Sequence, residues 1–333
     1  MNFSELSVLI TGGTGSFGNA FVKCMINRFH PKRLIVFSRD ELKQSEMAKQ
    51  IDYPGMRFFI GDVRDQARLS RAFHGVDIVI HAAALKQVPT LEYNPFEAIL
   101  TNVIGSENII AAALDQNVKK VVALSTDKAV NPINLYGATK LCAEKLFVAA
   151  NSYSGANGTK FSAVRYGNVI GSRGSVIPLF LAQKQTGVIT ITDSRMTRFW
   201  LSLDQAVDTV LYALEHMQGG EIYVPKVPAV NILDLAKIVA PGCQIKNIGI
   251  RPGEKLHEIL ITEDEGVRTF DAGDYYSILP TFDFRNSIRR ENYKKLPENF
   301  KYSSDDSPHQ LAGEELQALI NQQVDVSFAK VAP

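Results

Sequence analysis

Two short segments of this sequence hold side chains that together could transfer protons. The first, residues 125–128, reads Ser-Thr-Asp-Lys, and the second contains Tyr136 and Lys140. This tyrosine and lysine are about one helical turn apart, so they would lie on the same face of a helix. A nearby ammonium favours the phenolate, and Tyr136 is therefore predicted to act as a base well below the ordinary tyrosine pKa of about 10. Such a pair is suited to removing the proton of a hydroxyl group.

Asp127 and Lys128 add an acid and a base that removal of one hydroxyl proton does not need. They follow the apolar run 121–124, which predicts a strand, so both would stand at the end of that strand. This excess of acid and base groups favours a reaction that goes beyond a simple alcohol oxidation. The alternative interpretation of Lys128 is a solvated lysine at a strand end.

Short apolar runs and longer helical patterns alternate in the first half of the chain and must position these groups. The runs predict strands at 7–11, 34–37, 57–60, 77–80, 121–124 and 161–165. Nearly continuous apolar strands are typical of a sheet covered on both faces, so we expect an α/β fold with a Rossmann-type, doubly wound parallel sheet. We expect residues 1–167 to form a dinucleotide-binding domain. Residues 168–333 would form a smaller α/β substrate domain, with some segments returning to the central sheet.

A glycine-rich turn follows the first predicted strand and opens a helix. Residues 11–18 read Thr-Gly-Gly-Thr-Gly-Ser-Phe-Gly, a spacing that lets the backbone approach a pyrophosphate at a helix N-terminus. The second strand ends in Ser38, Arg39 and Asp40, and Lys43 follows one turn later. A carboxylate there suits NAD, whereas an arginine suits the 2′-phosphate of NADP, so we predict NADP. The alternative is that Arg39 and Lys43 are solvated charges at a helix start.

Further segments after the third and fourth strands could complete the cofactor site. Asp62 and Val63 follow the third strand, where a carboxylate can meet the adenine amine. The run 81–84 (His-Ala-Ala-Ala) follows the fourth, and its small residues would let the backbone approach the cofactor, although a packed turn explains them equally well. Lys86 would reach a ribose or the nicotinamide edge.

The overall composition narrows the classes of function. The chain has 333 residues, of which 45% are hydrophobic and 21% charged, with a formal net charge of +1, so nothing favours nucleic acid as a partner. Three widely spaced cysteines argue against disulfides and a zinc site, and we expect no metal. The sequence shows neither a signal peptide nor an apolar run long enough for a membrane, so we expect a cytoplasmic protein without a membrane partner.

These motifs resemble the extended short-chain dehydrogenase/reductases that act on nucleotide sugars. The resemblance rests on residues 11–18, 81–84 and 165–169, on Ser125 and on the Tyr136/Lys140 pair, and it covers nearly the whole chain. Most 4,6-dehydratases of this group have Thr-Asp-Glu where this chain has Thr-Asp-Lys. The lysine, together with segments 39–46, 131–137 and 196–200, is similar to the inverting UDP-N-acetylglucosamine 4,6-dehydratases that open the pseudaminic acid pathway.

The resemblance implies NADP as cofactor, UDP-N-acetylglucosamine as substrate and a homo-oligomer, either a dimer or a hexamer. Motifs and resemblance together assign catalysis to Thr126, Asp127, Lys128 and Tyr136. They assign cofactor binding to Gly12, Thr14, Gly15, Ser16, Phe17, Gly18, Ser38, Arg39, Asp40, Lys43, Asp62, Val63, Ala82, Ala84, Lys86, Ser125, Tyr136, Lys140 and Val169. They assign substrate binding to Lys86, Asn168, Pro178, Arg195, Thr197, Arg198, Arg251 and Glu254.

The implied reaction is a dehydration with inversion at C5 and no net redox change. Tyr136, held as phenolate by Lys140, would take the 4-hydroxyl proton as hydride passes from C4 to NADP. Lys128 as a neutral amine would then remove the C5 proton while Asp127 or Thr126 assists loss of the 6-hydroxyl as water, and hydride would return to C6. For this we expect positive neighbours and partial burial to lower the pKa of Lys128 from about 10.4, with Asp127 opposing the change.

Three alternatives stay open at the level of sequence. A 4,6-dehydratase/5-epimerase of the N-acetyl-L-fucosamine branch shares the Asp-Lys pair, but typically has methionine in place of the tyrosine. A 4-epimerase would need only Tyr136 and Lys140. A non-catalytic NADP-binding scaffold or sensor would commonly have lost one of these groups.

Overall fold

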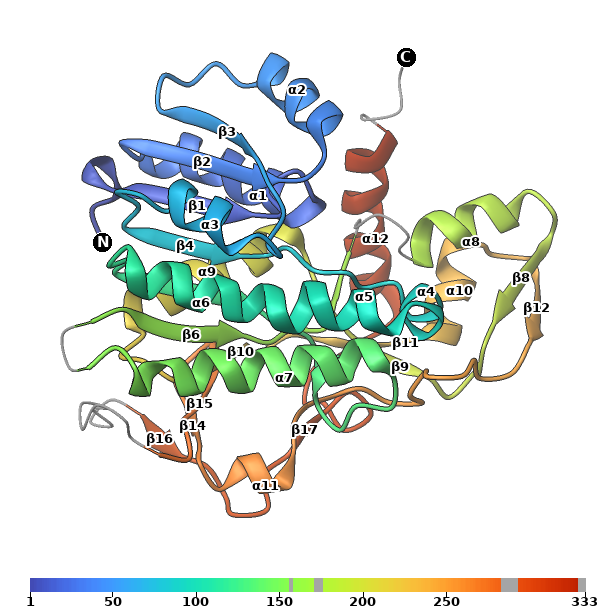
Figure 1. Cartoon of the computed structure of the whole chain (residues 1–333). Helices are drawn as coiled ribbons and strands as arrows, with labels where there is room; N and C mark the ends of the chain where they lie inside the picture. The colour runs from blue at the N-terminus through green and yellow to red at the C-terminus, as the bar shows by residue number, and fades with distance from the viewer. Residues whose placement is uncertain (156–157, 171–175, 283–292, 329–333) are drawn as a thin grey trace.

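The centre of the molecule is a ten-stranded sheet whose middle part is parallel (Figure 1). The computed structural model describes residues 1–155, 158–170, 176–282 and 293–328. Within these residues, parallel neighbours follow the order β3-β2-β1-β4-β5-β6-β10. The bounds are β1 (Ser7–Thr11), β2 (Arg33–Ser38), β3 (Met56–Ile60), β4 (Ile78–His81), β5 (Lys120–Leu124), β6 (Lys160–Val164) and β10 (Ile222–Pro225).

Helices cover both faces of this sheet because its strands are apolar on both sides. One hydrophobic core lies between the sheet and α1 (Ser16–Cys24), α2 (Glu41–Gln50) and α9 (Leu203–His216). A second core lies on the opposite face, against α3 (Gln66–Ala72), α6 (Gly105–Asp115) and α7 (Leu135–Ala149). Phe21 in the first core and Phe147 in the second are fully buried, and each contributes about 1.5–3 kcal/mol by leaving water. The predicted doubly wound sheet is confirmed.

The strand order places a crevice where ligands of such sheets bind. The chain runs from β1 outward to β2 and β3, then returns to β4 on the other side of β1 and continues to β5 and β6. The loops after β1 and β4 therefore diverge at the carboxyl ends of these two strands. This reversal of direction is the position at which open α/β sheets hold their ligands.

The second half of the chain contributes to the central sheet and also builds smaller sheets. Antiparallel strands β15 (Tyr275–Ile278), β14 (Thr269–Asp271) and β16 (Lys294–Lys295) extend the central sheet beyond β10. The smaller sheets contain β7 (Asn168–Val169), β8 (Val188–Ile191), β9 (Thr197–Leu201), β11 (Ala229–Asn231), β12 (Gln244–Asn247), β13 (Ile259–Ile261), β17 (Tyr302–Ser303) and β18 (Gln310–Leu311).

A third hydrophobic core holds the smaller lobe together. It includes Phe180, Trp200 and Leu235, which come from α8 (Val176–Lys184), β9 and α10 (Ile232–Val239). Helix α12 (Gly313–Phe328) contacts α10, and α11 (Glu263–Gly266) lies before β14. Figure 1 shows α8, α10, β8 and β12 together at one side of the central sheet, beyond α4 and α5.

Short helical segments follow several of the strands and helices. Before α6 the chain forms α4 (Val88–Tyr93), α5 (Pro95–Ile99) and a π-helical turn, η3 (Leu100–Ile104). The other short segments are η1 (Phe3–Glu5), η2 (Met25–Phe29), η4 (Asp127–Ala129) and η5 (Ala150–Ser152). None of the helices in the described ranges is both long and apolar enough to span a membrane.

Candidate active site

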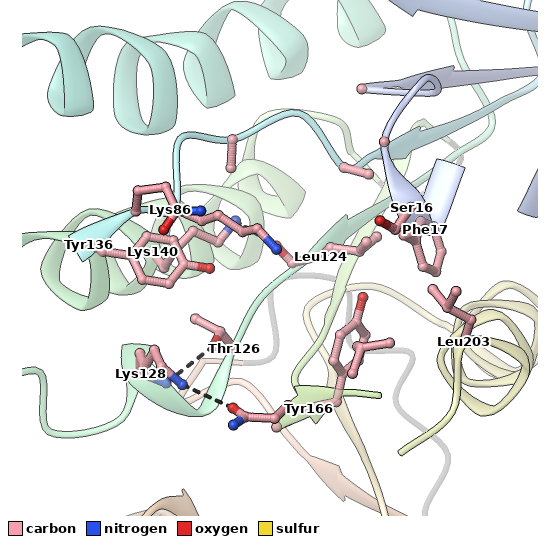
Figure 2. A pocket seen from close by; sticks show the side chains of 18 of the residues that line it. Ser16, Phe17, Lys86, Leu124, Thr126, Lys128, Tyr136, Lys140, Tyr166 and Leu203 are labelled. Atoms are coloured by element: carbon pink, nitrogen blue, oxygen red, sulfur yellow. Dashed lines mark hydrogen bonds between the residues drawn. The ribbon is translucent and has the colours of Figure 1, made fainter. Parts of the chain in front are cut away.

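One cavity of about 830 Å³ runs from the glycine-rich turn after β1 to the smaller lobe. Its size lies in the range expected of a small-molecule site. Figure 2 shows Lys86, Tyr136 and Lys140 close together on one side, with Ser16 and Phe17 across the cavity. Lys128 lies beyond Thr126, toward the smaller lobe. Several lysines and arginines line the walls, so the cavity suits a ligand with several negative charges.

The glycine-rich turn provides the close backbone approach that a pyrophosphate needs. Gly12 has φ +66°, and a Cβ at this residue would lie 2.9 Å from the Ala83 backbone. Gly18 lies against Gly13, whose carbonyl oxygen would be 2.3 Å from an added Cβ. Helix α1 begins at Ser16 without a side-chain cap, so its first N–H groups remain free to meet an anion. The residues present therefore fit a dinucleotide cofactor, and Thr14, Gly15, Ser16 and Phe17 also line the cavity.

The residues after β2 line the part of the cavity where an adenosine ribose would lie. Asp40 caps α2 by accepting a hydrogen bond from the Lys43 amide at 3.0 Å, and its side chain also pairs with the Lys43 ammonium. Ser38 accepts a hydrogen bond from Gln44 at 2.9 Å. The Arg39 side chain is 52% exposed and lies 3.5 Å from Asp62. Arg39, Asp40 and Lys43 all line the cavity, and the Asp40 carboxylate is engaged with the start of its own helix and with Lys43.

The cofactor residues expected after β3, β4, β5 and β6 also lie on the cavity wall. They are Asp62, Val63, Ala82, Ala84, Lys86, Ser125 and Val169. The Asp62 carboxylate is bound by Arg64 at 2.7 Å, which differs from the expectation that it would be free for an adenine amine. The Ser125 hydroxyl oxygen is buried and has no hydrogen-bond partner among the described residues, as expected of a group that would bind a ligand.

Tyr136 and Lys140 share one face of α7, but their electrostatics differ from the sequence-based expectation. The Lys140 ammonium donates to the carbonyl of Leu124 at 2.5 Å, and burial lowers the pKa of this lysine to about 8 against the pull of Glu144. Burial raises the pKa of Tyr136 to about 12, and the cation that opposes this rise is Lys128. The expectation that Lys140 holds the pKa of Tyr136 well below the ordinary value of about 10 is therefore wrong.

Asp127 and Lys128 lie in η4, directly after β5, where Thr126 caps the short helix. The Lys128 ammonium lies 3.0 Å from the Asp127 carboxylate and 3.3 Å from the side-chain oxygen of Asn168. Asp127 is fully buried, and its second oxygen has no hydrogen-bond partner among the described residues. Thr126, Lys128 and Asn168 line the cavity, whereas Asp127 lies behind them.

The electrostatic surroundings of Lys128 contain a carboxylate that the sequence analysis missed. Burial disfavours the charge of Lys128, but Asp127 and Glu258 outweigh it, so the pKa of Lys128 is raised. The expected lowering is wrong because Glu258, 130 positions further along the chain, lies 3.5 Å from the ammonium. The only signal in the sequence is an acidic residue directly before the apolar run 259–261, and such a residue is normally a solvated strand end.

The expected substrate residues divide into two groups. Lys86, Asn168, Arg198, Arg251 and Glu254 line the cavity. Three others do not: Thr197 is buried and bonds to His257 and Ser304, Pro178 is exposed on α8, and Arg195 is 70% exposed in an ion pair with Asp193. We therefore no longer assign these three residues to the substrate.

The described part of the chain holds no group of three or more His, Cys, Asp or Glu side chains that could bind a metal ion.

Fold and cavity define a nucleotide-binding enzyme of the extended short-chain dehydrogenase/reductase type. The chain belongs to the polysaccharide biosynthesis protein family, whose sequence model matches residues 8–280. It is 51% identical over 328 residues to the UDP-N-acetylglucosamine 4,6-dehydratase (inverting) of Campylobacter jejuni, covering 96% of this chain and 98% of that relative. The resemblance seen in the sequence is thereby confirmed.

Two further comparisons bear on fold and function. The chain is 49% identical over 284 residues to a protein of Rickettsia canadensis named UDP-glucose 4-epimerase, and the alignment covers 83% of each chain. The X-ray structure of Pen from Bacillus thuringiensis superimposes with a TM-score of 0.89 at 40% identity, covering 97% of this chain and 99% of that one.

Proposed function

We propose that this protein is an inverting UDP-N-acetylglucosamine 4,6-dehydratase that works with NADP. It would convert UDP-N-acetylglucosamine to UDP-2-acetamido-2,6-dideoxy-β-L-arabino-hex-4-ulose and water. The observation that carries the proposal is that Tyr136 and Lys128 both line the cavity where its cofactor part meets its substrate part, with the buried Asp127 carboxylate 3.0 Å from the Lys128 ammonium. The 51% identity to a Campylobacter jejuni enzyme of this name supports the same assignment.

Each side chain in this cluster has a role that its position allows. A nicotinamide cofactor, when bound, supplies reversible acceptance of hydride. Tyr136 takes the proton of the sugar 4-hydroxyl, and the positive charge of Lys128 stabilises the phenolate. Lys128, as free amine, takes the proton from C5, which the neighbouring 4-ketone makes acidic. Thr126, which lines the cavity and donates a hydrogen bond to the buried Asp127 carboxylate at 2.8 Å, assists departure of the 6-hydroxyl as water, and Asp127 acts through Thr126.

The protonation of Lys128 sets a condition on this scheme. The two carboxylates that raise its pKa keep the amine charged when the substrate is absent. Nearby positive charge, including an oxidised nicotinamide, lowers the pKa of an amine, so a bound cofactor favours release of the proton. We therefore expect turnover to increase with pH on the acidic side of its optimum.

Product analysis in heavy water tests the proposal. The expected product of UDP-N-acetylglucosamine has lost water, has inverted C5 and has deuterium at C5. Lys128→Ala should abolish label at C5, whereas Lys119→Ala, an exposed lysine paired with Asp77, should label normally. Full conversion without label at C5 in the unsubstituted protein would refute the role of Lys128.

The 4-epimerase is the second candidate, because a relative of that name is 49% identical over 284 residues. It would exchange the configuration at C4 without loss of water and would leave C5 unlabelled. The presence of Asp127 and Lys128 beside Tyr136 supports the dehydratase, since an epimerase has no use for them. A non-catalytic scaffold would give no product in the same experiment. A 4,6-dehydratase/5-epimerase of the N-acetyl-L-fucosamine branch would also lose water and invert C5, and the tyrosine at position 136, where that branch typically has methionine, disfavours it.

The preference for NADP rests on Arg39 and Lys43, which line the cavity after β2 while Asp40 caps its helix. A guanidinium at this place can bind a 2′-phosphate. Arg39→Ala should weaken NADP binding at least about tenfold and leave NAD binding nearly unchanged. Tighter binding of NAD than of NADP to the unsubstituted protein would contradict this preference.

We further propose a cytoplasmic homo-oligomer that serves the pseudaminic acid pathway. Apolar side chains on the segment from α4 to α6 are exposed, and this supports self-association: Tyr93, Phe96, Ile99 and Ile104. Light scattering coupled to size exclusion tests the oligomer, and a monomer at micromolar concentration would contradict it. Loss of pseudaminic acid from surface glycans after gene deletion tests the pathway.

A further inference from the structure

A buried group of five charges lies under the part of the cavity next to the smaller lobe. Glu258 is 2% exposed, and one of its oxygens lies 3.5 Å from the Lys128 ammonium and 3.8 Å from the Arg198 guanidinium. Its other oxygen lies 3.9 Å from the Lys255 ammonium. Asp127 completes the group through Lys128. Lys128 and Arg198 line the cavity, whereas Glu258 lies behind them.

The backbone of Glu258 is held firmly from another part of the chain. Its amide donates to the Ser304 hydroxyl at 2.8 Å, and its carbonyl accepts from the Ser304 amide at 2.8 Å. These bonds belong to the pairing of β13 with β17, so the smaller lobe fixes where the carboxylate lies. Glu258 therefore connects the end of β5 with β9 and with the turn that carries Arg251 and Glu254.

The charges in this group balance only when one cation gives up its proton. Three cations face two carboxylates, which leaves one positive charge in excess if all five are ionised. Loss of a proton from Lys128, or from Lys255, whose pKa burial lowers, makes the group neutral. A buried carboxylate is costly unless it is paired, and these cations provide the pairing of Glu258.

The carboxylate of Glu258 also has unused hydrogen-bonding capacity. Within the described residues, none donates a hydrogen bond to its Oε2, although this atom is buried. Its contacts with the three cations are 3.5 Å or longer, so they are ion pairs without close hydrogen bonds. Glu258 thus acts on Lys128 mainly through its charge.

We propose that Glu258 is a positioning residue for the reaction described above: its carboxylate orients Lys128 and Arg198 and tunes the basicity of Lys128. The inference rests on the proposed function, because it assigns Lys128 the removal of the C5 proton. The sign of the effect follows from charge. An anion beside an ammonium stabilises the charged form, so Glu258 makes Lys128 a stronger base that becomes free at higher pH.

Other charged and titratable groups also face Lys128 and remain in place when Glu258 is changed. They come from η4, from β9, from the turn before β13, from α7 and from the loop after β4: Asp127, Arg198, Lys255, Tyr136 and Lys86. Substitution of Glu258 alone therefore isolates its contribution.

The test compares three variants over a pH range with the intact protein, UDP-N-acetylglucosamine and NADP. Glu258→Gln removes the negative charge and keeps the size of the side chain. Glu258→Asp keeps the charge but moves it away from Lys128 by the length of one methylene group. Glu221→Gln is the matched control, since Glu221 is equally buried but lies outside the cavity wall. The readouts are kcat, KM and deuterium incorporation at C5 at each pH.

In the plots of kcat and of C5 exchange against pH, we call the rising part on the acidic side the acidic limb. In Glu258→Gln we expect this limb to move to lower pH by about one to three units. The plateau of kcat should fall, because a less basic amine removes the proton more slowly. Glu258→Asp should move the limb in the same direction by less, which keeps the test available if Glu258→Gln does not fold. Glu221→Gln should leave the limb where it is.

The outcomes separate this inference from the proposed function. If the unsubstituted protein makes no dehydrated product, the proposed function fails and this inference fails with it. If it makes the product and neither Glu258 variant moves the limb, this inference alone is overturned. A fall in activity without any movement of the limb would mean that Glu258 is structural, and would overturn the inference as well.

Discussion

Replacing Arg165 with methionine should destabilise the protein strongly, because Arg165 is the centre of a buried ion network. Its side chain is 1% exposed and makes two hydrogen bonds to Glu144, at 2.7 and 3.0 Å, and two to Glu265, at 2.8 and 3.0 Å. A fifth bond reaches the carbonyl of Leu260 at 2.8 Å. The network joins α7, which carries Tyr136, to α11 in the second half of the chain.

The magnitude follows from what the substitution leaves behind. Glu144 is 2% exposed, so Arg165→Met leaves a buried carboxylate without its partner, which costs about 3–5 kcal/mol. Glu265 is 14% exposed and can turn to water, so its contribution is smaller. Adding Glu144→Leu to Arg165→Met should recover most of the loss, because the second change removes the unpaired charge.

The pH dependence of this loss has a definite sign. Burial favours the neutral form of Glu265, but the bonds from Arg165 outweigh it and lower its pKa below the usual value. A lowered carboxyl pKa stabilises the fold above the unfolded pKa of about 4.3, and this stabilisation is lost as pH falls through the folded value. The difference between wild type and Arg165→Met should therefore be largest near neutral pH and shrink below about pH 4.

Urea unfolding of the wild type, the single variant and the double variant between about pH 3 and pH 8 measures these free energies. A loss of less than about 1 kcal/mol in Arg165→Met at pH 7 would refute the reasoning. So would a double variant that is no more stable than the single one, since the cost would then not come from the unpaired carboxylate.

Three further predictions concern the cavity. Tyr136→Phe should lower kcat about 10²–10⁴-fold with cofactor affinity nearly unchanged, measured by product formation and by cofactor titration; a tenfold or smaller loss would count against the tyrosine as base. Gly12→Ala should weaken cofactor binding at least about tenfold, because φ is +66° and the new Cβ would meet Ala83 at 2.9 Å; unchanged affinity in calorimetry would contradict the fit of the turn to a pyrophosphate. Burial lowers the pKa of Lys140 to about 8, below its unfolded value, so folding stability should rise with pH between about 8 and 10. Lys140→Met should remove this rise. At pH 7 it should also increase the free energy of unfolding by about 1–2 kcal/mol, which is the gain from removing the buried charge minus the loss of the hydrogen bond to Leu124. Urea unfolding at pH 7 and 10 tests both effects.

The six strands of the first half could be predicted from sequence to within about one residue at each end. The reason is local: runs such as 8–10 and 121–124 are apolar throughout, and a strand that is buried on both faces needs that composition. The smaller sheets could not be predicted in the same way. Strands such as β7 and β17 are two residues long, and pairing with distant partners defines them rather than their own composition.

The cavity wall could also be predicted in large part, because its residues follow strands. Groups such as Ser38, Asp62 and Ser125 stand directly after parallel strands, whose carboxyl ends meet at one edge of the sheet. The predictions of substrate-binding residues in the second half of the chain were less accurate, because three of these residues do not line the cavity. Arg195 and Pro178 are exposed and do not line the cavity, because the sequence alone does not specify which face of α8 or of the turn before β9 meets the cavity.

The sequence by itself determined the fold of the first half, the glycine-rich turn and the Tyr136/Lys140 pair, because each depends on neighbours within one strand or one helical turn. Only the tertiary structure decided the charge state of the groups in the cavity. The pKa of Lys128 depends on Glu258, which β13 brings to it from 130 positions away, and the pKa of Lys140 depends on the depth at which α7 is buried. Electrostatic energies depend on distance in space and on exclusion of water, and sequence spacing specifies neither of these.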